Sequence, residues 1–142
     1  MLAIAAKLLG AGRVMGLDSD PMAVEVARRN AERAGVDVEW RLADVRTVGE
    51  RFETIFMNPP FGSQRRHADR PFFDAAFAWG RVVYAFLNAK AEGYVRRRIE
   101  SGSGKITDRL AYAFPIPHTF DFHREEVRRI DVVLYRFEAA KG

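Results

Sequence analysis

Hydrophobic and polar positions change period several times along the 142-residue chain. Short apolar or alternating runs, bounded by polar or glycine-containing turns, predict strands at 13–17, 36–42, 52–57, 82–87, 109–114 and 129–137. Helical composition or period predicts helices over 1–9, 21–34, 71–80 and 90–101. Strands that alternate with helices are typical of a three-layer α/β domain, in which helices cover both faces of a mostly parallel, twisted sheet.

Two of these elements make more detailed predictions. The helix at 21–34 opens on Asp20-Pro21, an N-cap followed by proline at the first helical position. The residues expected on its buried face are Val26, Ala27, Asn30, Ala31 and Ala34. The segment 36–42 alternates strictly, with Val36, Val38, Trp40 and Leu42 facing one side. Because inner parallel strands are usually apolar on both faces, this half-polar strand is expected at a sheet edge.

Composition narrows the class of protein. Apolar residues make up 48% of the chain and charged residues 30%, which favours a single domain over 1–142. No apolar run approaches the ~18 residues needed to span a bilayer, and residues 1–9 are too short for a signal peptide. Without cysteine there is no disulfide or thiolate metal site, and His118 and His123 are not spaced as a metal pair. We expect no metal site, no membrane association and a cytoplasmic location.

The charge of +4 is unevenly distributed. Residues 1–62 hold 8 Lys and Arg against 9 Asp and Glu, whereas residues 63–142 hold 15 against 10. Such an excess of basic groups suits a polyanionic substrate, although solvated helix faces are an equally simple explanation for any one cluster. The candidate nucleic-acid contacts in these clusters are Arg65, Arg66, Arg97, His123 and Arg124.

Asn58-Pro59-Pro60-Phe61, which follow the strand at 52–57, are the most informative residues in the chain. The two prolines end the strand, because each fixes φ and neither has a backbone N–H to donate. The Asn58 side-chain oxygen and the Pro59 carbonyl can accept hydrogen bonds from an amine, and the Phe61 ring can stack on a base. The loop therefore predicts a site that grips a flat group bearing an amine.

Two acidic residues also follow predicted strands. Asp18 follows the strand at 13–17, a position that in doubly wound folds presents a carboxylate to the ribose hydroxyls of a nucleoside cofactor. An N-cap is the other role open to Asp18, but Asp20 fills it better. Asp44 follows the strand at 36–42, where the simpler explanation is a turn-forming aspartate.

Asp18, Asp44 and residues 58–61 occur in an order that resembles class I S-adenosylmethionine-dependent methyltransferases. More narrowly, residues 16–21, 28–32 and 57–62 resemble the small archaeal and eukaryotic methyltransferases that modify N6 of an adenosine in small-subunit rRNA. This resemblance extends over essentially the whole chain. It implies a Rossmann-like class I methyltransferase fold and S-adenosylmethionine as cofactor.

The resemblance also implies residue roles and partners. Asp18 would bind the ribose, Ser19 would lie along the cofactor adenine, Asp44 would accept from its N6 amine, and the Val45 N–H would meet N1. Asn58 belongs to both the cofactor-binding and the catalytic sets. The catalytic set comprises Asn58, Pro59, Pro60 and Phe61. Relatives pair with a small zinc-containing activator protein through an exposed sheet edge, for which 36–42 is the natural docking strand.

One departure from the family pattern concerns the cofactor. The family begins with a strand and a Gly-rich loop that wraps the methionine part of the cofactor. Gly10-Ala11-Gly12 follow a predicted helix, so they are expected to end that helix and not to bind cofactor. The missing strand is also the central strand of the sheet. We therefore expect two half-sheets, an internal methionine at Met1 and a truncated methyltransferase domain that alone is unable to bind cofactor or catalyse transfer.

The predicted reaction is methyl transfer to N6 of adenine in RNA, and the expected substrate is ribosomal RNA. Asn58 and Pro59 would orient the amine lone pair, with no general base required. DNA adenine, rRNA guanine-N2 and release-factor glutamine methylation remain alternatives. A fragment that binds RNA or a partner without catalysis is a fourth.

Overall fold

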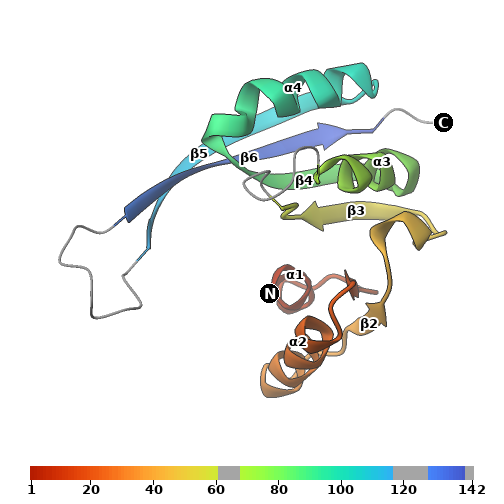
Figure 1. Ribbon diagram of the computed structural model, residues 1–142. Coiled ribbons are helices and arrows are strands. Elements are labelled where there is room, and N and C mark those ends of the chain that lie inside the picture. The colour runs from red at the N-terminus through yellow and green to blue at the C-terminus, as the bar shows by residue number, and fades with distance from the viewer. Residues whose placement is uncertain (61–67, 117–127, 140–142) are drawn as a thin grey trace. The chain divides into compact units, whose positions relative to one another are not determined.

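The computed structural model describes residues 1–60, 68–116 and 128–139 (Figure 1). These residues form two compact units, which we call unit one (residues 1–51) and unit two (residues 52–142). None of the helices in the described part of the chain combines the length and apolar character that a membrane span requires.

Unit one is a short parallel βαβ unit preceded by a helix. Its elements are α1 (Leu2–Leu8), β1 (Met15–Asp18), α2 (Pro21–Arg33), β2 (Glu39–Leu42) and the 3-10 turn η1 (Val45–Thr47). β1 pairs with β2 in parallel, with Asp18 opposite Leu42. The Asp20 carboxylate caps α2 by accepting from the Met22 N–H, as the sequence predicts.

Packing in unit one corrects two sequence-based predictions. Val24 and Ala31 are the buried residues of α2, whereas Val26, predicted to be inside, is 52% exposed. The apolar side of 36–42 is buried only in part, since Val38 is buried but Leu42 is 58% exposed. The strand itself begins at Glu39, three residues later than predicted.

Unit two contains a four-stranded sheet and two helices. Its elements are β3 (Phe52–Met57), α3 (Arg70–Trp79), β4 (Gly80–Asn88), η2 (Ala89–Ala91), α4 (Glu92–Ser101), β5 (Lys105–Ile116) and β6 (Arg128–Glu138). The strand order is β3-β4-β6-β5. β3 and β4 are parallel, while β6 runs antiparallel to both of its neighbours. The predicted parallel pairing therefore holds for β1–β2 and β3–β4, and the last two strands form an antiparallel hairpin.

The core of unit two lies between α3, α4 and one face of the sheet (Figure 1). Alternate strand residues point toward the helices, because side chains of a strand project to opposite faces with a period of two. The buried members of this cluster include Phe73, Val83, Ile99, Tyr135 and Phe137. This packing fixes β3 and therefore the point at which the chain leaves it after Met57.

Candidate functional site

The acids predicted to bind cofactor lie at one edge of unit one. Asp18 is the last residue of β1, and Asp44 follows β2 by two residues. Because β1 and β2 are parallel, their carboxyl ends meet at the same edge of the sheet. Asp18 and Ser19 are exposed there, and Asp18 Oδ1 accepts from the Asp20 N–H at 3.0 Å.

Asp44 is held by its own neighbour two residues later. Its Oδ1 accepts from the backbone N–H of Arg46 at 2.9 Å, which makes it the N-cap of η1. The Arg46 guanidinium also donates from Nε to Oδ1 at 2.9 Å and from Nη2 to Oδ2 at 2.5 Å. These hydrogen bonds lower the pKa of Asp44 to about 2, so its carboxylate is ionised at neutral pH. Val45 begins η1, where backbone N–H groups have no partner within the helix.

The amine-gripping residues lie where β3 ends. Met57 and Pro59 are buried, whereas Asn58 and Pro60 between and after them are exposed. Pro59 is among the most fully buried side chains of the described residues. A buried, rigid proline beside an exposed amide fixes the backbone while leaving the Asn58 side chain accessible. Phe61, the stacking ring of the predicted site, lies outside the described residues.

The remaining predicted residues are distributed as follows. Unit one brings together Asp18, Ser19, Asp44 and Val45, and unit two contains Asn58, Pro59 and Pro60. Arg97 is exposed on α4. Within the described residues, no group of three His, Asp or Glu side chains is arranged to hold a metal ion. The predicted site residues that lie outside the described residues are Phe61, Arg65, Arg66, His123 and Arg124.

A closed ring of four charged residues supports the Asp44 turn, and sequence reasoning missed it. Arg13 donates to Glu39 and to Glu50, both at 2.7 Å. Arg41 donates to the same two carboxylates at 2.7 and 2.8 Å. Glu39 and Arg41 precede the Asp44 turn and Glu50 follows it, so the ring ties the two ends of that turn together. Arg13 is 26 and 37 residues away in sequence from its two partners, so no local pattern reveals the closed ring.

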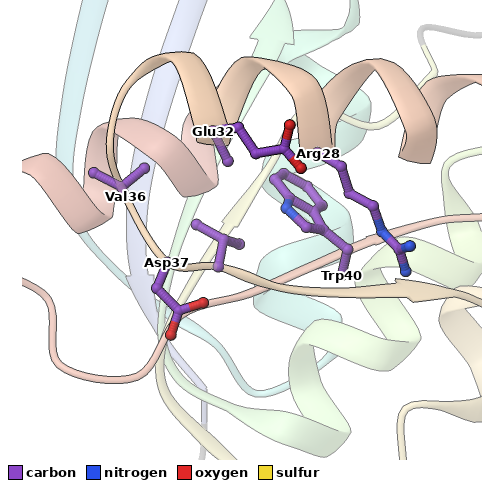
Figure 2. Close-up of a pocket in the computed structure, with 7 residues that line it drawn as sticks. Arg28, Glu32, Val36, Asp37 and Trp40 are labelled. Atoms are coloured by element: carbon purple, nitrogen blue, oxygen red, sulfur yellow. The ribbon is translucent and has the colours of Figure 1, made fainter.

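A second feature of unit one is a pocket of about 300 Å³ between α2 and the segment that leads into β2. Its apolar lining comes from Ala31, Val36, Val38 and Trp40, and its charged lining from Arg28, Glu32 and Asp37. Figure 2 shows the Trp40 indole beside the Arg28 and Glu32 side chains of α2. The pocket therefore lies alongside β2 and is formed by different residues from the Asp18 and Asp44 edge.

The residues present fit the nucleoside part of a cofactor. The exposed Asp18 carboxylate, the partly exposed Asp44 carboxylate and a helix-initiating amide are suitable partners for ribose hydroxyls, an amine and a ring nitrogen. The methionine part has no matching Gly-rich loop in residues 1–142. Gly10 comes just after α1 with φ of +94°, which confirms the predicted helix-ending role.

Parallel β-α-β connections with acids at the strand ends, and Asn-Pro-Pro after β3, define a class I methyltransferase. The family model of ribosomal protein L11 methyltransferase (PrmA) matches residues 1–58. The crystal structure of a proposed RNA methyltransferase from Pyrococcus horikoshii is 41% identical, with a TM-score of 0.81 over 99% of this chain and 70% of that one.

Two curated relatives identify the family. An uncharacterized protein of Methanocaldococcus jannaschii is 37% identical over 96% of this chain and 68% of its own length. The Drosophila melanogaster rRNA N(6)-adenosine-methyltransferase Mettl5 is 32% identical over 97% of this chain and 68% of its own length. The chain belongs to the methyltransferase family that contains fly Mettl5, which confirms the predicted fold class and the resemblance.

Proposed function

We propose that this methyltransferase uses S-adenosylmethionine to methylate N6 of an adenosine in RNA, with ribosomal RNA as the substrate class. The observation that carries the proposal is the Asn58-Pro59-Pro60 turn after β3, in which an exposed amide follows the strand and a buried proline holds the backbone. Fly Mettl5, a member of the same family, is named for this activity.

Unit one supplies residues for the nucleoside part of the cofactor. Asp18 accepts from the ribose hydroxyls and Ser19 lies along the adenine. Asp44 accepts from the adenine N6 amine, while the Val45 N–H donates to N1. When bound, S-adenosylmethionine supplies an electrophilic methyl group on its sulfonium. Support comes from the shared edge of β1 and β2, at which both carboxylates are accessible.

Unit two supplies acceptors for the target amine. The Asn58 side-chain oxygen and the Pro59 carbonyl accept its two N–H groups, which directs the nitrogen lone pair away from them. They also stabilise the positive charge that develops on that nitrogen. Alignment of well-held reactants contributes up to ~7–11 kcal/mol. The ammonium that methyl transfer forms is acidic enough to lose its proton to water, so no general base is needed beside these residues.

RNA contacts are proposed on the basic side chains outside the turn. Arg97 is exposed on α4, and the basic residues Arg65, Arg66, His123 and Arg124 are retained from the sequence. Phe61 is retained as the ring that stacks on the target base. An Arg97→Glu variant should weaken binding of structured RNA with an unpaired adenosine, since it replaces a phosphate-attracting charge with a repelling one. Arg29→Glu, on an exposed face of α2, is the matched control. Equal affinity of the two variants would remove Arg97 from the proposed RNA surface.

A small zinc-containing activator protein is the proposed partner of β2. Within the described residues β2 pairs only with β1, so its other edge is free to accept a strand. The N–H groups of Glu39 and Ala43 point toward β1, and the alternate N–H of Leu42 therefore points outward. Leu42→Pro removes an outward donor without breaking a β1–β2 hydrogen bond and should abolish co-purification with the activator. Leu42→Ala is the control, and equal capture of both would contradict strand addition.

The proposal also includes the domain organisation and the cellular location of the protein. A single methyltransferase domain over 1–142 is supported by relatives whose match covers 96% and 97% of this chain, across both units. A cytoplasmic location is supported by the ribosomal RNA substrate class of fly Mettl5.

The substrate class is tested by transfer of a labelled methyl group. Ribosomal subunits, free rRNA, DNA and release factor are incubated separately with labelled cofactor and a chimera in which the first strand and Gly-rich loop of a longer family member precede Met1. The proposal predicts label in rRNA or ribosomal subunits. Label in DNA or on release factor would replace the RNA proposal with the corresponding alternative.

A further inference from the structure

Arg46 makes three hydrogen bonds to one carboxylate. Its backbone N–H and Nε donate to Asp44 Oδ1, and its Nη2 donates to Oδ2. A carboxylate has about four acceptor positions, two on each oxygen. The fork from Arg46 therefore occupies both positions on Oδ1 and leaves one on Oδ2, which the proposed function assigns to the cofactor amine.

We propose that Arg46 is a positioning residue that fixes Asp44 as an acceptor and so selects a 6-aminopurine over a 6-oxopurine. The inference rests on the proposed function, because it assumes that Asp44 meets the adenine. A 6-oxopurine presents a carbonyl oxygen and an N1–H where adenine presents an amine and a bare N1. It therefore mismatches both the Asp44 carboxylate and the Val45 N–H. The low pKa of Asp44 agrees with this role, since a protonated carboxyl could donate to the oxo group.

The local geometry separates this role from a structural one. Removing the Arg46 side chain keeps the backbone N–H that donates to the Asp44 cap of η1, so the turn is retained. The ion pair is exposed, with 71% of the Arg46 side chain and 41% of the Asp44 side chain accessible. Exposed pairs contribute little to stability. The guanidinium is thus dispensable for folding, and its loss alters mainly the orientation of the carboxylate.

Adenosine and inosine are the probes, and each is titrated into the 142-residue chain. Binding is followed by NMR through the backbone amide signals of Asp18, Ser19 and Val45, because NMR detects dissociation constants in the millimolar range. The unsubstituted chain should bind adenosine about tenfold more tightly than inosine. Arg46→Ala should reduce the ratio of adenosine affinity to inosine affinity about threefold or more. The spread of the backbone amide signals should be unchanged, which shows that the variant is folded. Arg46→Lys should restore that ratio only in part, because a lysine has the charge without the fork.

Two controls make the outcomes distinct. Arg29→Ala removes an exposed arginine that pairs with Glu25 on α2, and it should leave the ratio unchanged. Asp44→Asn should abolish the preference for adenosine. If Asp44→Asn does so while Arg46→Ala keeps the full ratio, the role of Arg46 is refuted and the proposed function stands. If adenosine shifts none of the three amides in the unsubstituted chain, the nucleoside assignments of the proposed function fail and this inference fails with them.

Discussion

The indole ring of Trp40 occupies the space that a side chain at Gly16 would need. A Cβ built at Gly16 would lie 2.1 Å from the nearest ring atom of Trp40. The two residues are paired across β1 and β2, so the contact fixes how closely the strands of unit one approach. Glycine is therefore required at position 16 for packing.

Gly16→Ala should destabilise the protein by about 1–3 kcal/mol, the usual cost of overpacking. Urea unfolding measures the change. Gly12→Ala is the control, because nothing lies within 4 Å of a Cβ there. The double variant Gly16→Ala with Trp40→Leu should recover part of the loss, and strict additivity of the two changes would contradict the steric explanation.

The four-residue ring predicts stability that depends on pH and salt. Hydrogen bonds from Arg13 are the main cause of the lowered pKa of both Glu39 and Glu50. A carboxylate whose pKa is lower in the folded than in the unfolded protein stabilises the fold at pH values above its unfolded pKa. This stability is lost as the pH falls through the pKa of the folded protein. Arg13→Ala should therefore lower the unfolding midpoint at pH 7 and have less effect below about pH 4.

The matched control for the ring is Arg29→Ala, which removes one isolated exposed pair with Glu25. Its effect at pH 7 should be smaller, because isolated surface pairs contribute little. Added salt at ~1 M should reduce the difference between the two variants. A difference that is unchanged at pH 3 and in high salt would show that Arg13 acts through packing.

Tyr135, Glu92 and Arg109 link α4 to the hairpin of unit two. The Tyr135 hydroxyl donates to Glu92 Oε1 at 2.7 Å, and Arg109 donates to both oxygens of Glu92. These hydrogen bonds, with that from Arg109 first, lower the pKa of Glu92 to about 2. Tyr135→Phe should cost about 1 kcal/mol, the usual net value of one hydrogen bond.

Glu92→Ala should cost more than Tyr135→Phe, because it leaves the hydroxyl of a buried tyrosine without this acceptor. Its effect should be largest above pH 4.5 and should fade toward pH 2, since protonation of Glu92 weakens the same contacts in the unsubstituted protein. Unfolding by urea at several pH values tests this. A Glu92→Ala effect that is equal at pH 2 and pH 7 would contradict it.

Much of this fold was predictable because its signals are local. The Asp20 cap, the turn at Gly10 and the proline-terminated strand at 52–57 each depend on neighbouring residues, and all are present. Burial was less predictable, because it depends on which tertiary neighbours cover a face. Val26 and Leu42 fit apolar periodicities and are nevertheless exposed.

In the candidate site, too, features with a local sequence signal were predictable and features that depend on distant residues were not. Sequence order placed Asp18, Asp44 and Asn58 at strand ends, where the structure has them. The Asp44–Arg46 fork has a local signal, opposite charges two residues apart at a turn, which the sequence interpretation overlooked. The ring that joins Arg13 to Glu50 had no such signal, because 37 residues separate its partners.

The Gly-rich loop of the family has no counterpart in the sequence of residues 1–142. Measuring the affinity for S-adenosylmethionine tests whether cofactor binding requires that loop. Calorimetry should show little or no S-adenosylmethionine binding to this chain, because its sequence does not contain the Gly-rich loop that wraps the methionine part in the family. A chimera in which the first strand and Gly-rich loop of a longer family member are fused in front of Met1 should bind. Tight binding by residues 1–142 would contradict the role given to that loop.

The central claim is most directly tested by identifying the methylated nucleoside. Ribosomal RNA is treated with the chimera that carries the Gly-rich loop and with labelled S-adenosylmethionine, digested to nucleosides and analysed by mass spectrometry. We predict labelled N6-methyladenosine, reduced about 10²–10³-fold in rate by Asn58→Ala. Label in N2-methylguanosine, or an Asn58→Ala variant as active as the unsubstituted enzyme, would contradict the account.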